Sequence, residues 1–243
     1  MSTVIATSVL PDSTANDTLT FGATGDSVAI SGDSLNLNTL QDAGGNTIFV
    51  SDGSGTITSS AFGGSQKFIS SQSASNSASL VFTSGIDSTY DVYRFTFIDM
   101  NPATDNQNFE FQVNAAGQSG YNESVTSLYY AATHFEDDTY SAFVYDTGRD
   151  QAQGTSYQCL FGGCGNGADE AGVGELYLFA PSNTTSIKYW YSSCQMYSGS
   201  NASDNSFSGG AFETTSAIDE ISFRFASGNI VAGTVKMYGI SKS

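Results

Sequence analysis

Residues 90–114 read YDVYRFTFIDMNPATDNQNFEFQVN, and this stretch decides the fold class. Aromatic and polar side chains alternate over residues 93–97, and residues 109–113 alternate in the same way. Residues 221–225, ISFRF, repeat the pattern near the end of the chain. An alternation of period two places apolar side chains on one face of a β-strand and polar side chains on the other. We therefore predict an all-β chain with half-buried strands and an aromatic interior.

The rest of the chain after residue 65 predicts further strands separated by turns. We expect them near residues 126–131, 139–145, 156–161, 174–180, 185–191 and 232–240. About ten strands without helical patterns favour an antiparallel β-sandwich of the jelly-roll type over residues 66–243. Residues 176–179 and 189–191 are apolar on both faces, which indicates central strands or strands covered by another subunit.

Residues 1–65 differ in composition, since they contain no Lys or Arg. Their apolar residues occur singly or in pairs, at 19–21, 28–30, 35–37, 48–50 and 57. Such a segment has too few apolar residues to bury a core alone. We expect an extended N-terminal β arm or a shaft that intertwines with copies of itself, and the alternative is a flexible tail ordered by a partner. The Ser-rich residues 65–79 have the composition of a linker, with a short strand around Lys67–Ser70 as the competing prediction.

The charge of the chain excludes several partners. It has 7 Lys and Arg against 24 Asp and Glu, a net charge of −17, so nucleic acid and anionic membranes are not expected to bind. No apolar run is long enough to span a bilayer, and the first residues lack the pattern of a signal peptide. The three cysteines, an odd number, favour free thiols and synthesis in a reducing cytoplasm, although Cys159 and Cys164 could pair across a Gly-Gly turn.

Catalytic patterns are weak in this sequence. The single histidine, His134, would have to serve any Ser-His-Asp triad, and no G-x-S-x-G motif accompanies it. A zinc site would need His134 with three cysteines that lack a C-x2-C pair. We therefore predict that the chain is not an enzyme.

Paired carboxylates of a glycosidase are the remaining catalytic candidates. We expect Glu110 to be a cross-strand partner of an arginine instead. The candidate carboxylates are Glu110, Glu136, Asp137, Glu175, Glu213 and Glu220. No cofactor is expected, and Ca²⁺ at acidic loops is the only metal candidate, through residues 136–138, 169–170, 99 and 105.

Aromatic side chains beside polar loops are candidates for contact with a glycan or a protein partner. Residues 197–210 read as a long polar loop that carries two aromatic residues. Loops of this kind carry recognition on rigid scaffolds. The candidate binding residues are Tyr121, Tyr140, Tyr145, Tyr197, Asn201 and Phe207.

Several stretches resemble blocks that recur in virion structural proteins of tailed phages, especially phages of marine bacteria. They are residues 90–114, 174–181, 218–230 and 233–240, and residues 35–49 resemble the shaft-like leader of phage fibre proteins. The resemblance implies a component of the virion surface, such as a tail fibre, a spike, a head fibre or a decoration protein. Such proteins are commonly homotrimers, and the resemblance implies no site residues.

These observations lead to one expectation and two alternatives. We expect a non-enzymatic protein of the phage particle surface, a short fibre or spike that contacts host glycans, made in the host cytoplasm. Its expected partners are copies of itself, other virion proteins held by the N-terminal arm, and a host surface glycan. The alternatives are a capsid decoration protein anchored by the arm and a carbohydrate-active enzyme such as a depolymerase.

Overall fold

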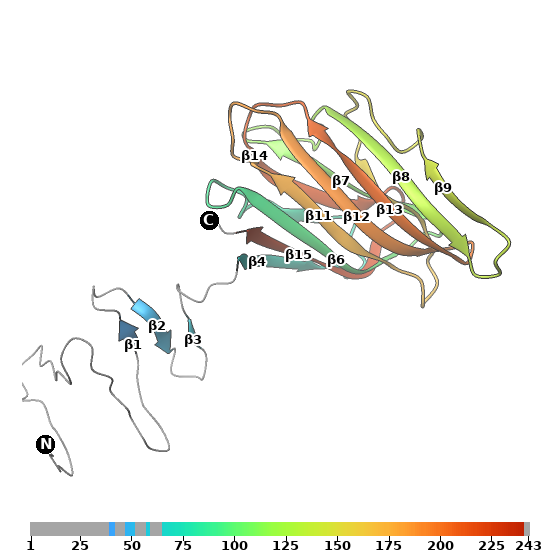
Figure 1. Ribbon diagram of the computed structural model, residues 1–243, viewed down its shortest axis with the longest axis horizontal. Coiled ribbons are helices and arrows are strands. Elements are labelled where there is room, and N and C mark those ends of the chain that lie inside the picture. The colour runs from blue at the N-terminus through green and yellow to red at the C-terminus, as the bar shows by residue number, and fades with distance from the viewer. Residues whose placement is uncertain (1–38, 42–46, 52–56, 59–64, 241–243) are drawn as a thin grey trace, which may run out of the picture. The chain divides into compact units, whose positions relative to one another are not determined.

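The structure is a computed structural model that describes residues 39–41, 47–51, 57–58 and 65–240. All regular elements in these residues are β-strands with antiparallel pairing (Figure 1), so the all-β prediction is confirmed. No helix in the described part of the chain could cross a membrane. The strands are β1 (Thr39–Gln41), β2 (Thr47–Ser51), β3 (Ile57–Thr58), β4 (Gln66–Ser73), β5 (Leu80–Phe82), β6 (Val92–Pro102), β7 (Gln107–Ala115), β8 (Val125–Phe135), β9 (Ser141–Tyr145), β10 (Gln158–Cys164), β11 (Gly172–Phe179), β12 (Lys188–Ser198), β13 (Ala202–Phe212), β14 (Ile218–Phe225) and β15 (Ile230–Ile240).

The strands belong to two units, Met1–Phe62 and Gly63–Ser243. The first unit contains a small sheet with the order β1-β2-β3. Two of its strands contain apolar positions that the sequence predicts, residues 48–50 in β2 and Ile57 in β3. The predicted strands at 19–21, 28–30 and 35–37 lie outside the described residues. The extended or intertwined form of this arm stays a prediction.

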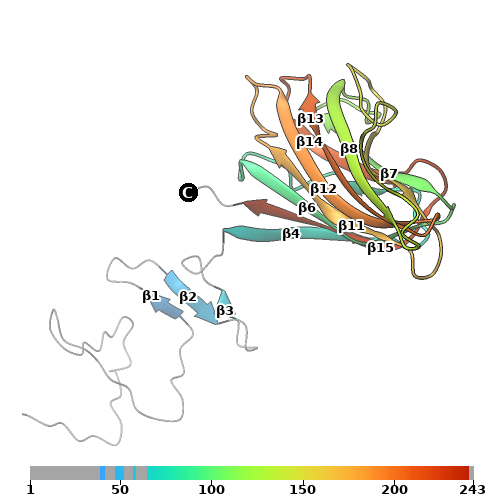
Figure 2. The same ribbon diagram turned by 45° about the vertical axis from the view of Figure 1, so that its right-hand side comes forward.

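The second unit is a twelve-stranded sheet whose pairing has two parts. Eight strands pair in the order β4-β15-β6-β11-β12-β13-β8-β9, and four pair in the order β5-β14-β7-β10. The residue pair Cys164–Ser198 joins β10 to β12 and so connects the two parts. Figure 2 shows the larger part as a strongly twisted sheet.

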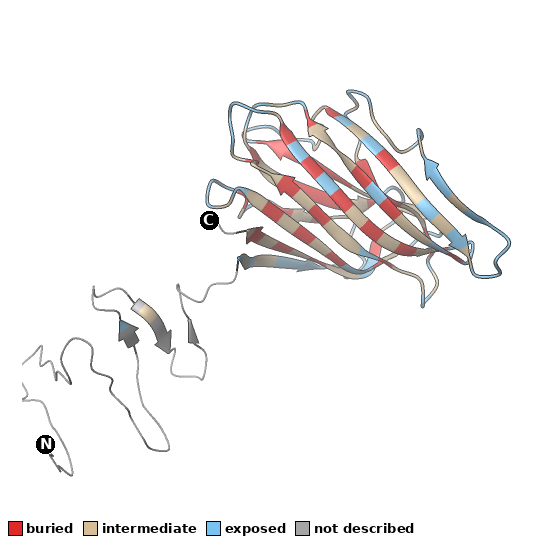
Figure 3. Cartoon of the chain, in the orientation of Figure 1, coloured by how far each residue is buried: buried red, intermediate tan, exposed pale blue. Residues whose placement is uncertain are grey.

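The core lies between the eight strands and the four strands. Buried and exposed residues alternate along the strands, as Figure 3 shows for β12. Rings from one part contact rings from the other, with centroids 5.3 Å apart for Phe97 and Phe109 and 4.8 Å apart for Phe111 and Trp190. Phe223 lies at the centre of this cluster and contacts Phe82, Phe95, Phe97, Phe109 and Phe111. The alternating aromatic residues of the sequence therefore build one interior.

The linker prediction for residues 65–79 is wrong over its first part, where Gln66–Ser73 form β4. The competing prediction of a strand at Lys67–Ser70 is confirmed, since β4 runs to Ser73 and pairs with β15 over its length. A strand at a sheet edge takes its cohesion from backbone hydrogen bonds, and its solvent face tolerates Ser and Gln. The composition of residues 66–73 alone therefore does not predict strand β4.

The prediction of a long polar loop at residues 197–210 is also wrong. A tight turn at 199–201 is followed at once by the eleven-residue strand β13. Most of its inward residues are small, with Phe212 at its end the large exception. Two buried hydroxyl groups, Ser192 Oγ and Ser208 Oγ, lie 2.7 Å apart in a hydrogen bond. Because Ser, Ala and Gly fill most of the inner face of this strand, its composition resembles that of a loop.

The thiols of the described chain form no disulfide. Cys159, Cys164 and Cys194 are buried and free. The proposed pairing of Cys159 with Cys164 across a turn is wrong, because Gly162 and Gly163 lie inside strand β10. Burial raises the pKa of all three thiols, so they stay protonated and unreactive.

Candidate binding surface

Aromatic side chains cover the outward face of the eight strands near their centre. The rings of Tyr177 on β11 and Tyr191 on β12 stack with centroids 5.0 Å apart, and Phe179 stacks on Tyr191 at 5.7 Å. Tyr189 and Tyr191 are 58% and 47% exposed. The prediction that residues 176–179 and 189–191 form central strands is confirmed, since β11 and β12 each pair on both sides. Among their outward rings, Tyr177 and Phe179 are half-buried, whereas Tyr189 and Tyr191 are exposed.

A shallow groove of about 530 Å³ follows this face from β11 to β8. Gly209 forms its floor, because the register places Gly209 between Tyr191 and Leu128. A side chain at this position would stand between the two walls. The neighbouring Gly210 points inward, where a Cβ atom would collide with the carbonyl oxygen of Thr126. Gly209 therefore leaves the groove open, and Gly210 allows β13 and β8 to approach each other closely. We call this groove the outer groove; its lining also includes Thr126, Phe179, Ile187, Tyr189, Trp190, Ala211 and Glu213.

Polar groups lie at one end of the outer groove and beside Tyr177, whose ring stacks on the groove residue Tyr191. At one end, Thr126 Oγ1 donates to Glu213 Oε1 over 2.6 Å, which leaves carboxylate and hydroxyl oxygens at the rim. Beside Tyr177, Arg94 Nη2 and Glu175 Oε2 form an ion pair of 2.7 Å. Aromatic faces with hydrogen-bonding groups at their edges suit a ligand that is apolar on one side and hydroxylated at its rim.

Two of the predicted binding residues, Phe207 and Tyr145, share one rung at the β9 side of the sheet, and Tyr140 lies at the other end of β9. Phe207 stacks on Tyr130 with centroids 5.4 Å apart, and Tyr145 is the register partner of Tyr130 on β9. The hydroxyl of Tyr145 donates to Asp150 Oδ2 over 2.7 Å. Tyr140 follows the β8–β9 turn, where its ring contacts Phe135 edge to face.

The other three predicted residues lie elsewhere. Tyr197 is on β12 and donates to Glu136, and Asn201 occupies the β12–β13 turn with φ of 56°. Tyr121 lies in the β7–β8 loop, donates to Glu220 Oε2 over 2.9 Å and has a raised pKa because of burial and this carboxylate. The six residues therefore do not form one site.

Sequence reasoning missed the outward aromatic residues of the outer groove as binding candidates. The available signal was the segment Leu176–Phe179, in which neither face is polar. On a strand with one buried face, an apolar outer face indicates that something else covers it. The position of Gly209 opposite Tyr191 depends on the register and had no local signal.

The candidate catalytic carboxylates are dispersed and each has a local partner. Glu110 faces Arg224 across β7 and β14 at 3.8 Å, which confirms the expected cross-strand arginine. His134 Nε2 lies 3.1 Å from Asp138 on an exposed turn. The partners of the remaining carboxylates are Tyr197 for Glu136, Thr139 for Asp137, Arg94 for Glu175, Thr126 for Glu213 and Asn114 for Glu220.

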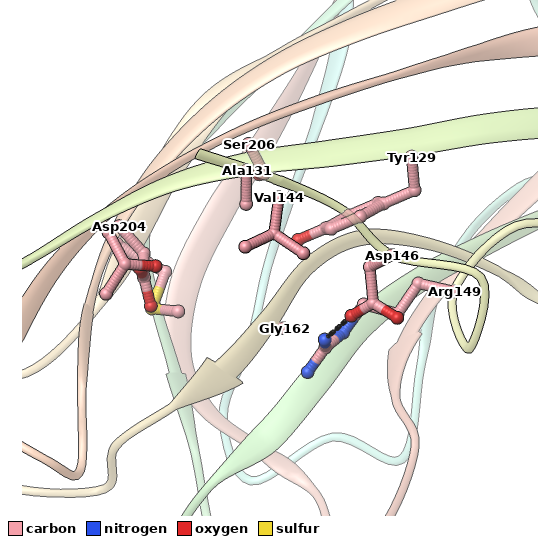
Figure 4. Close-up of a pocket in the computed structure, with 10 residues that line it drawn as sticks. Tyr129, Ala131, Val144, Asp146, Arg149, Gly162, Asp204 and Ser206 are labelled. Atoms are coloured by element: carbon pink, nitrogen blue, oxygen red, sulfur yellow. Dashed lines mark hydrogen bonds and ion pairs between the residues drawn. The ribbon is translucent and has the colours of Figure 1, made fainter. Parts of the chain in front are cut away.

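A smaller cavity of about 220 Å³ lies under β9, between β8, β10 and β13 (Figure 4). Arg149 pairs with Asp146, and its guanidinium group lies against Gly162, where a Cβ atom would collide with it. Arg149 Nε and Asp204 Oδ1 are buried without a hydrogen-bond partner, and burial raises the pKa of Asp204. Both atoms are closed off from solvent, so they do not offer a ligand a direct contact.

Within the described residues, no group of three His, Cys, Asp or Glu side chains is placed to hold a metal ion. Comparisons with protein-family models, with curated proteins and with solved structures find no match to this chain. The outer groove is therefore the candidate site on its geometry alone.

Proposed function

We propose that this protein is a non-enzymatic surface protein of a phage particle whose β-rich head binds neutral host glycans in the outer groove. The observation that carries the proposal is the pair of exposed rings, Tyr189 and Tyr191, beside the glycine floor of the outer groove. The resemblance of residues 90–114 to virion proteins supports the proposed place on a phage particle. A short fibre or spike is the form we propose.

The strand pairing supports a jelly roll for the head. If β8, β9, β12 and β13 are set aside, eight strands remain in the second unit. The first of them pairs with the last, the second with the seventh, the third with the sixth and the fourth with the fifth. This nested pairing is that of a jelly roll, an architecture shared by viral capsid and lectin domains. The four strands set aside extend one layer and carry much of the outer groove.

The chemistry of the outer groove favours a neutral sugar. A pyranose ring presents C–H groups on one face, which pack on an aromatic ring, and hydroxyl groups at its edge, which reach rim groups such as Glu213. The groove lining contains no basic residue, the nearby Arg94 is paired with Glu175, and the chain has a net charge of −17, so an anionic sugar would be repelled. Many weak contacts of this kind gain strength by avidity on a particle.

A glycan array with the purified full-length protein tests the proposal. We expect binding to neutral oligosaccharides and no preference for sulfated or carboxylated ones. Equal retention of acidic glycans, or no binding to the array, would contradict the glycan proposal.

Two further measurements address the alternatives. Immunogold labelling of heads but not tails would favour the capsid decoration alternative over a fibre or spike. Cleavage of a polysaccharide panel, lost in Glu110→Gln or Glu175→Gln, would favour the depolymerase alternative.

A further inference from the structure

Strand β9 forms an open edge of the eight-strand sheet. It pairs with β8 on one side, and no described strand lies on its other side (Figure 1). Its side chains are unusually apolar for such a position. Phe143 is 71% exposed, and Val144 and Tyr145 are exposed as well.

The hydrogen bonds at the two ends of β9 define which residues face the open side. Phe135 N donates to Tyr140 O over 2.9 Å, and Asp146 N donates to Tyr129 O over 3.0 Å. Bonded and non-bonded pairs alternate along an antiparallel ladder. Even-numbered residues from 140 to 146 therefore direct their backbone groups to β8. Ser141, Phe143 and Tyr145 direct their N–H and C=O groups outward.

This edge lacks the features by which proteins prevent strand pairing. Edges are commonly blocked by charged side chains, especially Lys, by Pro or by bulges. Residues 139–145 contain no charge and no Pro, and the pairing of β8 with β9 has no bulge. The opposite edge differs, because β4 carries Lys67 and its pairing with β15 has an irregularity.

A second copy of this chain fits this edge, because the segment is uncharged and its outward backbone groups are self-complementary in an antiparallel pair. Two molecules with a net charge of −17 repel each other over most of their surfaces, whereas residues 139–145 are a neutral window. We propose that β9 pairs antiparallel with β9 of a second copy, with a two-fold axis at Phe143. Ser141 then lies opposite Tyr145 of the second copy, and all three outward residues exchange both backbone hydrogen bonds. In this register Asp146 faces Tyr140 of the second copy and not another carboxylate.

The pairing would join two aromatic faces into one. Phe143 lies against Tyr130 with centroids 5.4 Å apart, and Tyr130 stacks on Phe207. Phe143 of the second copy continues this row across the axis. A two-fold contact cannot close a trimer by itself, so it pairs chains or links larger assemblies two by two.

Cross-linking of the full-length chain tests the register. In a dimer of the Phe143→Cys variant, the two introduced thiols would lie beside the two-fold axis, where a short bismaleimide can bridge them. The native cysteines are buried and do not react with this reagent. Phe68→Cys is the matched control, since Phe68 is 59% exposed on the opposite edge strand. We expect a covalent dimer from Phe143→Cys and none from Phe68→Cys. Equal cross-linking of both variants, or of neither, would overturn the proposal.

Native mass by light scattering gives an independent test. Phe143→Pro removes an outward N–H group and leaves the β8 ladder intact, because Phe143 does not bond to β8. We expect a twofold fall in mass relative to the parent chain for Phe143→Pro and for Phe143→Lys, and no change for Phe68→Lys. An unchanged mass in both Phe143 variants, including a parent chain that is already monomeric, would overturn the proposal. Edge pairing with another protein would then be the alternative.

Discussion

Tyr93 is fully buried, and Asp87 satisfies its hydroxyl group. Tyr93 Oη donates to Asp87 O over 3.0 Å and accepts from Asp87 N over 2.9 Å. Burial, with the nearby carboxyl of Asp87, raises the pKa of Tyr93 to about 12. This side chain therefore ties the loop before β6 to the core.

We expect Tyr93→Phe to lower the free energy of unfolding by about 1–2 kcal/mol, because a backbone N–H group loses its partner. Thermal denaturation measures the change. Tyr145→Phe is the control, since its hydroxyl bond to Asp150 is exposed and should contribute little. Equal losses in both variants would contradict this role.

Glu110 makes folding stability depend on pH. Burial raises the pKa of its carboxyl, and the charge of Arg224 opposes that effect. Because the folded state binds this proton more tightly than the unfolded state, the group stabilises the fold most at low pH. That contribution is lost as the pH rises through the folded pKa. Glu110→Gln should therefore gain stability relative to the parent chain between about pH 4 and pH 7. Urea denaturation at both pH values measures the difference, and a relative stability that falls with pH would contradict it.

At the scale of elements, the two adjacent glycines of β13 have separate roles. A Cβ atom on Gly210 would collide with Thr126 O and lie 2.9 Å from Ser127 Cα. A Cβ atom on Gly209 would make ordinary contacts, the nearest being Trp190 O at 3.4 Å. Gly210 is therefore needed for close packing of β13 against β8, whereas Gly209 keeps the outer groove open.

We expect Gly210→Ala to destabilise the fold by about 1–3 kcal/mol through strain between β13 and β8. Gly209→Ala should keep its thermal stability and narrow the outer groove, so that glycan binding weakens. Denaturation and glycan binding are measured on both variants. Strong destabilisation by Gly209→Ala, or none by Gly210→Ala, would contradict this assignment.

The strands differ in how well the sequence alone predicts them. The alternation at residues 93–97 and 109–113 predicted β6 and β7, because each aromatic residue there faces the core. Strand β13 was not predictable in this way, since small inward residues such as Ser206 and Ser208 carry no hydrophobic pattern. The Ser-rich β4 has the same difficulty. The local sequence pattern predicts a buried strand only when large apolar side chains occupy its inward face.

At the scale of the whole molecule, pairing between distant strands determines the shape of the outer groove. β4 pairs with β15, and the rung that contains Tyr191 brings together β11, β12, β13 and β8. No local pattern specifies such long-range register. Loop composition therefore predicts binding residues that are dispersed in the fold, and only Tyr145 and Phe207 share a rung. The outer groove arises from the register of four strands.

The most direct test of the central claim is calorimetric titration of the best neutral glycan from the array into matched variants. Tyr191→Ala removes a wall of the outer groove, whereas Tyr140→Ala removes an exposed ring at the β8–β9 turn. We predict that Tyr191→Ala weakens binding about tenfold or more, as expected when a main contact residue is truncated, and that Tyr140→Ala leaves it unchanged. Unchanged affinity in Tyr191→Ala, with loss in Tyr140→Ala, would place binding outside the outer groove and contradict the proposed function.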